Sequence, residues 1–104
     1  MTFRVQFTRE AAQDIERLFD FLVDRESARH GDLNVAQQAL DAIRKGIETL
    51  QWTPFTCRKV GVSPFLRELV IPFGHAGYVA LFEIVDDLTV VVAAIRHQRE
   101  DDYH

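Results

Sequence analysis

The chain has 104 residues, of which 47% are hydrophobic and 27% are charged, and its formal net charge is −4 at pH 7. This length and composition indicate a single domain over residues 1–104 and exclude a low-complexity protein. Because phosphate contacts dominate affinity for nucleic acid, the acidic balance argues against general nucleic-acid binding and against sequence-specific DNA binding by this chain.

The sequence also lacks the features of membrane and secreted proteins. No apolar run approaches the roughly 20 residues that a membrane span requires, and no signal peptide is visible. A single cysteine, Cys57, excludes an internal disulfide and fits a reducing compartment. We therefore expect a cytoplasmic protein that does not engage a membrane.

The chain begins with the pattern of a strand followed by a helix. Apolar and polar residues alternate over 3–7, which is typical of a short strand with one buried face. Thr8 is well placed to cap a helix, which is expected to run to about Arg25. The apolar residues of this helix recur at spacings of three and four, as Ala11, Ile15, Leu18, Phe19 and Leu22, with Phe21 and Val23 widening the stripe.

A break over 27–32 separates this helix from a second one. Asp32 or Asn34 provides the cap, and the second apolar stripe ends at Leu50. Two amphipathic helices joined by a short link form a helical hairpin. Because neither stripe is wide enough for complete burial of its helix, we expect both helices to lie across one face of a sheet.

The second half of the chain predicts that sheet. Three runs between residues 65 and 97 are rich in Val, Ile, Leu, Phe and Tyr and are separated by turn residues, which is the pattern of an antiparallel meander. Asp86-Asp87 suits a two-residue hairpin turn. The last run is apolar on both faces apart from Thr89, so we expect a neighbour on each side of it, one of them the first strand of the chain.

The segment from Gln51 to Pro64 is the least regular part of the sequence, and we expect Trp52 and Phe55 to anchor it to the core. The predicted order is therefore β-α-α-β-β-β. This order indicates an α+β fold in which a helical hairpin packs on a four-stranded, mainly antiparallel sheet.

Polar residues gather where the last predicted strand ends, and such positions can build a site on a rigid base. In an RNA-cleaving site, His97 can act as general acid or base near neutral pH. Arg67, Arg96 or Arg99 can stabilise a developing phosphorane charge. Tyr103 can donate a proton or stack on a base.

The same residues also fit a structural role. His97 can bond to the strand ends while Arg99 pairs with Glu100 or Asp101, and the residue types alone favour this interpretation. The chain also lacks the lysine cluster expected of a nuclease. Its histidines do not have the spacing of metal ligands, and no glycine-rich phosphate loop is present, so we expect neither a metal nor another cofactor.

The order of these elements resembles the RelE/ParE superfamily of bacterial type II toxins over nearly the whole chain. The resemblance includes the opening strand, the helical hairpin, an arginine at Arg67 that begins a strand, and the tyrosine-containing run 77–84. Its most specific part is the apolar run 90–95, which leads directly into Arg96-His97-Gln98-Arg99.

The resemblance implies a small toxin that is held inactive by a cognate antitoxin encoded beside it. RelE-like members cut messenger RNA in the ribosome, whereas ParE-like members poison DNA gyrase and are not known as nucleases. The acidic charge, the absence of lysines near Arg67, the long hairpin and the His97-Gln98-Arg99 ending favour the ParE branch. A third alternative is a degenerate, non-toxic member that is kept as a binding partner.

On the ParE interpretation, the toxin binds gyrase and stabilises its cleaved-DNA state without catalysing a reaction. We expect the target-binding residues among Arg67, Arg96, His97, Arg99 and Tyr103; if the chain instead cleaves RNA, all of these except Arg96 are the catalytic candidates. A ParD-like antitoxin with a ribbon-helix-helix DNA-binding part is expected to wrap a segment against the hairpin groove and the sheet edge. The resulting hetero-oligomeric complex would repress its own operon.

Overall fold

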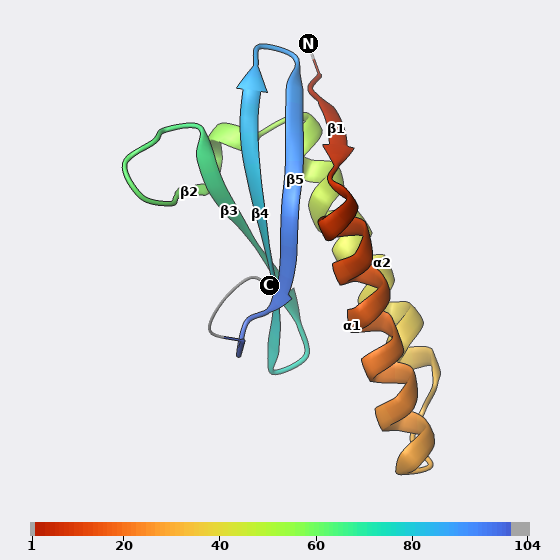
Figure 1. Cartoon of the computed structure of the whole chain (residues 1–104). Coiled ribbons are helices and arrows are strands. Elements are labelled where there is room, and N and C mark those ends of the chain that lie inside the picture. Colours follow the sequence, from red (N-terminus) through yellow and green to blue (C-terminus); the bar gives the residue numbers. More distant parts are fainter. Residues whose placement is uncertain (1, 101–104) are drawn as a thin grey trace.

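The computed structural model describes residues 2–100, in which two α-helices pack against one face of a mixed five-stranded sheet (Figure 1). The sheet has the order β1-β5-β4-β3-β2, and only the β1–β5 pair is parallel. The elements are β1 (Arg4–Phe7), α1 (Arg9–Ala28), α2 (Asn34–Glu48), β2 (Arg58–Lys59), β3 (Leu66–Phe73), β4 (Ala76–Asp86) and β5 (Thr89–His97), with short 3₁₀ turns η1 (Thr49–Gln51) and η2 (Pro54–Thr56).

This arrangement confirms the predicted α+β fold with a helical hairpin on a sheet, and it confirms the predicted neighbours of the last strand. The predicted strand count was wrong, because β2 adds a fifth strand at the edge beside β3. Its two residues pair with Glu68 and Arg67. A strand of two residues has no periodicity of its own, so only the pairing with β3 defines it.

The helix boundaries depend on side-chain and backbone caps. The Thr8 hydroxyl accepts a hydrogen bond from the Ala11 N–H at 3.1 Å, as predicted for the start of α1. The same helix extends three residues beyond the predicted end. His30 then adopts a positive φ of 56°, and the Gly31 N–H donates to the Glu26 carbonyl at 2.8 Å, which is a Schellman-type ending.

The second helix begins at Asn34, whose N–H donates to the Asp32 carboxylate at 2.8 Å. Regular α-helix ends at Glu48, before the predicted Leu50, and the chain then continues through the 3₁₀ turn η1. In that turn Leu50 is completely buried. The next residue after the turn, Trp52, is 66% exposed, so its predicted anchoring role was wrong because Leu50 already fills the space beneath the sheet.

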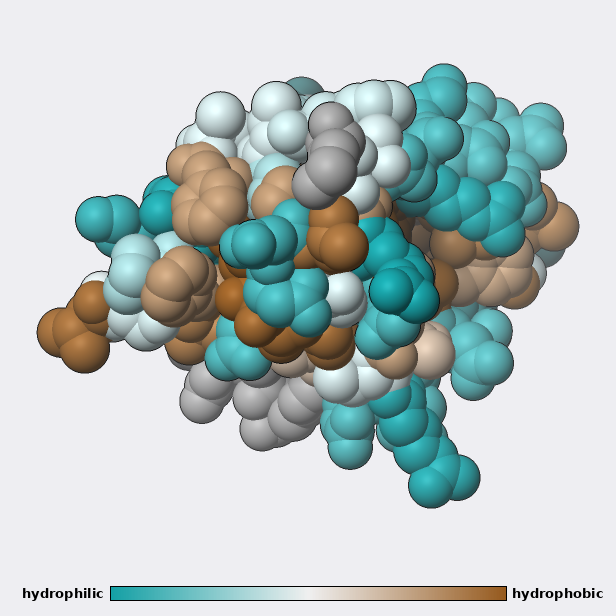
Figure 2. Space-filling view, turned by 90° about the horizontal axis from the view of Figure 1, so that it is seen from above, coloured by the Kyte–Doolittle hydropathy of each residue, from teal (hydrophilic) through white to brown (hydrophobic). Residues whose placement is uncertain are grey.

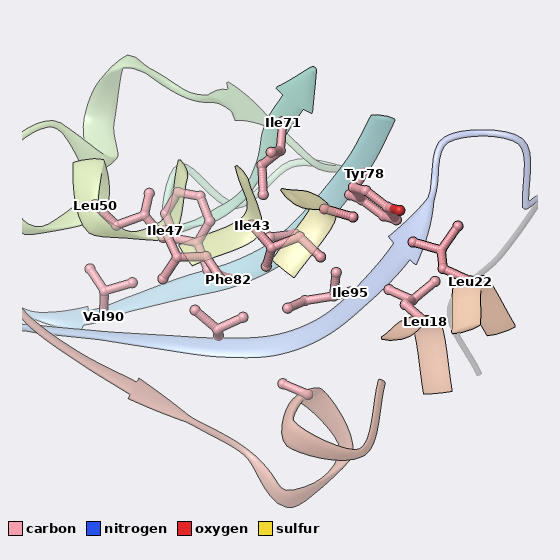
Figure 3. Close-up of a cluster of buried hydrophobic side chains, with 14 of the residues drawn as sticks. Leu18, Leu22, Ile43, Ile47, Leu50, Ile71, Tyr78, Phe82, Val90 and Ile95 are labelled. Carbon is pink, nitrogen blue, oxygen red and sulfur yellow. The ribbon is translucent and has the colours of Figure 1, made fainter. Parts of the chain in front are cut away.

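The core lies between the helices and the sheet (Figure 3). Phe82 of β4 and Val90 and Ile95 of β5 point toward the hairpin and are almost completely buried. Val92 of β5 is buried in the same core. The helices contribute their apolar stripes to the same core, in particular Leu18, Leu22, Ile43 and Ile47. Within the described residues, no helix has the length and apolar character needed to cross a membrane.

Several large apolar side chains remain exposed at the end of the molecule that carries the β4–β5 turn. Figure 2 looks onto this end and shows hydrophobic residues interspersed with hydrophilic ones. Phe55 is half-exposed, although its ring contacts Phe3 at a centroid distance of 6.4 Å, so its predicted anchoring role is only partly fulfilled. Exposed neighbours on the irregular segment between η1 and β3 include Val62 and Phe65.

Where β1 ends, residues of helix α1 and its cap provide hydrogen-bond partners for the edge of β5. The parallel β1–β5 pairing stops at Val92, and the register against β4 shifts so that Ala93 is an extra, bulged residue. The Thr8 N–H donates to the Val92 carbonyl and the Thr8 hydroxyl to the Ala93 carbonyl, both at 2.9 Å. Nearly two turns further along the chain, the Asp14 carboxylate of α1 accepts the Ile95 N–H at 2.9 Å.

We expect Asp14→Ala to lower the free energy of unfolding by about 1–3 kcal/mol, because it leaves the buried Ile95 N–H without its acceptor. Asp14 is only 4% exposed, so water has poor access to replace the carboxylate. The exposed Asp20 on the same helix provides the matched control, and Asp20→Ala should change stability by less than about 0.5 kcal/mol. Urea unfolding of both variants measures the difference; equal effects would contradict the role given to Asp14.

Candidate partner-binding groove

A groove of about 830 Å³ lies between the tip of the α1–α2 hairpin and the β3–β4 hairpin, and the turn after β5 closes one side. Its apolar surface comes from both layers of the fold. The helices contribute Leu18, Phe21, Leu22 and Val35, and the strands contribute Phe73 and Tyr78. Phe21 is 60% exposed and does not join the core, contrary to its predicted place in the buried stripe.

One face of α1 supplies most of the charge in the groove. Arg17, Phe21, Arg25 and Arg29 follow one another at a spacing of four residues, which places them on the same side of the helix. The Arg25 guanidinium lies 5.9 Å from the centre of the Phe21 ring, within range of a cation–π contact. Sequence reasoning missed this row as a site because charged residues at helical spacing usually mark an ordinary solvated face.

The groove carries positive charge although the whole chain is acidic. Among the lining residues that the structure describes, the four arginines Arg17, Arg25, Arg29 and Arg99 are accompanied by only two carboxylates, Glu26 and Glu100. A ligand that combines carboxylates with apolar side chains therefore complements this surface.

Glu26 fixes two of these arginines at the tip of the hairpin. Its side chain is almost completely covered and accepts hydrogen bonds from Arg29 Nε at 2.8 Å and Arg29 Nη2 at 2.6 Å. Arg25 Nη2 donates to the same carboxylate at 3.4 Å. The Arg29 hydrogen bonds are the main reason that the pKa of Glu26 lies below its ordinary value. A Cβ atom at Gly31 would collide with Glu26 Oε2, so a larger residue there would displace the carboxylate from this position.

His97 and Tyr78 form the wall of the groove on the sheet side. The two rings meet edge to face at a centroid distance of 5.6 Å. Burial lowers the pKa of His97, the positive charges of Arg99 and Arg25 lower it further, and Glu100 opposes them. Its Nδ1 atom accepts the Arg99 backbone N–H at 3.1 Å, so the neutral ring carries its proton on Nε2.

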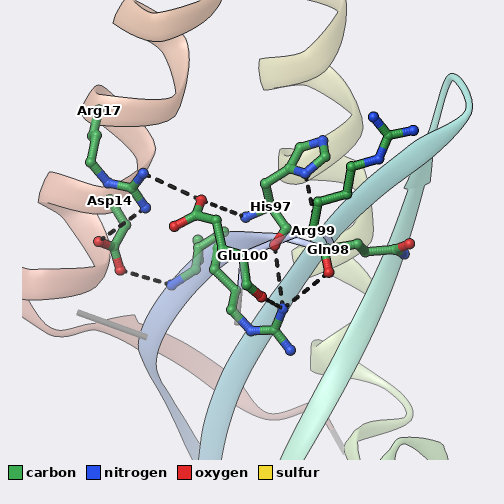
Figure 4. Close-up of polar contacts among 8 residues, drawn as sticks. Asp14, Arg17, His97, Gln98, Arg99 and Glu100 are labelled. Carbon is green, nitrogen blue, oxygen red and sulfur yellow. Dashed lines mark hydrogen bonds and ion pairs between the residues drawn. The ribbon is translucent and has the colours of Figure 1, made fainter. Parts of the chain in front are cut away.

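The structure brings two of the five predicted site residues, His97 and Arg99, into the groove. Arg96 lies on the opposite face of the sheet, because strand neighbours alternate between faces. Its Nη1 atom donates to the Glu100 carbonyl at 2.6 Å, and its Nη2 atom lies 3.9 Å from the Glu68 carboxylate. Figure 4 shows the polar contacts of His97, Arg99 and Glu100 around the turn after β5.

Arg67 is remote from His97. It pairs with Phe82 on β4, whereas His97 pairs with Tyr78, which is four residues or about 13 Å along the strand. The Arg67 side chain is buried, and its guanidinium donates to the carbonyls of Pro64, Phe55 and Cys57 at 2.7, 2.9 and 2.7 Å. These bonds attach the irregular segment before β3 to the sheet. The remaining predicted residue, Tyr103, lies outside the described residues.

Comparison with known proteins decides the family. Residues 5–102 match the family described as "ParE toxin of type II toxin-antitoxin system, parDE". The chain belongs to this ParE toxin family. It is 35% identical over 103 residues to Toxin RelE1 of Caulobacter vibrioides, a match that covers 96% of this chain and 98% of that protein. The RelE/ParE resemblance seen in the sequence is thereby confirmed.

A solved structure from a ParDE system shares the fold. A chain from the chromosomal ParDE toxin–antitoxin system of P. aeruginosa superposes with a TM-score of 0.71 at 19% identity, over 91% of this toxin and 95% of that chain. YafQ from E. coli gives a TM-score of 0.44 at 11% identity, over 92% and 93% of the two chains. Membership of the ParDE family implies that the toxin forms a complex with an antitoxin.

We expect Glu26→Gln to reduce the stability of the toxin at pH 7 and to have less effect in acid. The folded-state pKa of Glu26 is below its ordinary value of 4.5, so its ionised form stabilises the native state above that pH. This contribution is lost as the pH falls through the folded-state pKa of Glu26. The free energies of unfolding of the Glu26→Gln variant and the unmodified toxin should then converge. Urea unfolding at pH 7 and at several acidic pH values measures the effect.

The exposed Glu16 on the same helix serves as the control, since Glu16→Gln removes an equal charge without touching Arg29. A stability difference for Glu26→Gln that does not change with pH would show that the shape of the side chain, and not its charge, matters.

Proposed function

We propose that this ParE-family toxin poisons DNA gyrase by stabilising its cleaved-DNA state, and that a ParD-like antitoxin neutralises it by occupying the groove. The antitoxin is expected to carry a ribbon-helix-helix DNA-binding part, so that the complex represses its own operon. The observation that carries the proposal is the groove itself, which combines apolar floor residues with four arginines on a toxin of the ParE family.

The chemistry of the groove supports an antitoxin segment as its occupant. Leu18, Leu22 and Tyr78 offer apolar contacts at its base, and the exposed Phe21 offers an aromatic anchor at its rim. The arginines around them favour carboxylates on the partner. An amphipathic segment with acidic residues beside its apolar face meets both requirements, as in other grooves that take a partner helix.

The position of Arg67 supports binding over RNA cleavage. A catalytic set of Arg67, His97 and Arg99 would need these side chains around one phosphate. Instead, three carbonyls hold the Arg67 guanidinium at a different level of the sheet. His97 and Arg99 alone, beside Tyr78, provide a contact surface that a large protein target can use.

RNA cleavage in the ribosome remains the second candidate function, and one observation favours it. His97 and Tyr78, which are both capable of proton transfer, lie in contact at the groove. The relative that carries the name Toxin RelE1 is consistent with this alternative. The degenerate, non-toxic alternative predicts that expression without an antitoxin leaves bacterial growth unchanged.

The first test is a supercoiling assay with purified toxin, gyrase, relaxed plasmid and ATP. We expect loss of supercoiling and accumulation of cleaved DNA, both reversed by the antitoxin encoded beside the toxin gene. Arg99→Ala should raise the half-inhibitory concentration about tenfold, because it removes an interface cation worth about 1–2 kcal/mol. Arg44→Ala, which removes an exposed arginine of α2 outside the groove, should leave inhibition unchanged.

Intact supercoiling with folded toxin and active gyrase would contradict the gyrase proposal. Cleavage of messenger RNA on ribosomes by the same toxin, abolished by His97→Ala, would then establish the second candidate.

We also expect Phe21→Ala to weaken antitoxin binding about thirtyfold, because exposed aromatic anchors in such interfaces contribute about 2 kcal/mol. Phe65→Ala is the matched control, since Phe65 is a similarly exposed phenylalanine that lies beside Ile84 of β4 and outside the groove. Isothermal titration calorimetry with the purified antitoxin measures both. Equal losses for the two variants would place the antitoxin elsewhere on the toxin.

A further inference from the structure

The turn after β5 is attached to α1 through a single carboxylate. The chain reverses after β5, where the Glu100 N–H donates to the His97 carbonyl at 3.0 Å. This reversal brings Glu100 Oε1 back to the end of the strand, where it accepts the His97 N–H at 3.0 Å and Arg17 Nη1 at 3.3 Å (Figure 4). Glu100 therefore contacts the strand and the helix at once.

No strand in the described part of the chain lies beside the His97 N–H, because β1 pairs with β5 only as far as Val92. Beyond Val92, two carboxylates accept N–H groups on this edge of β5. Asp14 accepts the Ile95 N–H from α1, and Glu100 accepts the next one on the same edge, that of His97. Both carboxylates also lie near Arg17, at 3.9 Å for Asp14 and 3.3 Å for Glu100.

The end of β5 and the turn after it carry two residues of the groove, His97 and Arg99. His97 Nδ1 accepts the Arg99 backbone N–H at 3.1 Å, so the imidazole orientation depends on the path of the chain through residue 99. On the other face of the sheet, Arg96 Nη1 donates to the Glu100 carbonyl at 2.6 Å. Backbone and side chain of Glu100 are thus held from opposite sides.

We propose that Glu100 is the positioning residue of the groove: its carboxylate joins the end of β5 to α1 and thereby sets the orientation of His97 and Arg99. The consequence of this positioning role for antitoxin binding rests on the proposed function. The effect of Glu100 on His97 is independent of the proposed function, because it depends only on contacts within the free toxin.

The test compares Glu100→Gln with Glu100→Ala by NMR titration of the His97 ring in the full-length toxin. Glutamine keeps an oxygen that can accept the His97 N–H but removes the negative charge. Among residues 2–100, the charged groups that act on His97 are Arg99 and Glu100 from the turn and Arg25 from α1. With Glu100 neutral and the ring still in place, the pKa of His97 should fall below that in the unmodified toxin.

Alanine removes both the charge and the acceptor, so the turn should open and His97 should gain contact with water. Since burial is the main cause of the lowered pKa, the value should then rise toward the ordinary pKa of histidine. Opposite shifts in the two variants support the proposal. Shifts of the same sign, or no shift in either, would overturn it.

Glu83→Gln provides the control, because Glu83 is an exposed carboxylate on β4. It should not change the titration of His97. Thermal unfolding of every variant confirms that the fold persists during the titration.

Calorimetry with the antitoxin separates this proposal from the proposed function. Glu100→Ala should weaken binding about tenfold while Glu100→Gln retains most of the affinity. If the two Glu100 variants shift the pKa of His97 in opposite directions, Glu100 is the positioning residue. If Glu100→Ala and Phe21→Ala also leave the antitoxin affinity unchanged, the groove is not the antitoxin site. Shifts of the same sign would remove the positioning role whatever the affinity.

Discussion

The fold depends on how the open edge of β5 is completed once β1 has ended. A strand edge with unpaired N–H and C=O groups is costly when buried and invites pairing with other chains when exposed. Thr8 and Asp14 supply the missing partners from α1, and a bulge at Ala93 adjusts the strand to them. One hydroxyl and one carboxylate therefore form the backbone hydrogen bonds that a neighbouring strand forms elsewhere in the sheet. These bonds also fix α1 against β5.

This junction also creates the groove. Because β1 stops early, α1 and the hairpin tip continue past the sheet, and the β3–β4 hairpin faces them across an open space. The row from Arg17 to Arg29 lines one side of this space, and His97 and Arg99 line the other. An acidic protein thus presents a local positive surface with apolar residues beneath it, which suits a partner that is acidic and amphipathic. Belonging to the ParE family, the toxin has a natural candidate for that partner in its antitoxin.

Arginine has three different roles around this fold. Arg67 is buried and holds the irregular segment before β3 through backbone carbonyls. Arg96 clamps the turn after β5 from the open face of the sheet. Arg99 follows in the same turn and lines the groove. Residue type alone does not distinguish these roles, since a guanidinium can donate to a carbonyl, a carboxylate or a phosphate.

The sequence by itself determined the types of the main elements, the helical hairpin and the placing of the first strand beside the last, and the order of these elements carried the family resemblance. These features follow from periodicity, capping and long apolar runs, which are local properties. Only the tertiary structure decided that β2 forms an edge strand, that Leu50 and not Trp52 fills the core, and that Phe21 faces outward. It also separated Arg67 from His97 and added the α1 arginines to the groove. The physical reason is that a site of this kind is made by residues on different elements, and their distances depend on how the strands register and where the helix crosses the sheet.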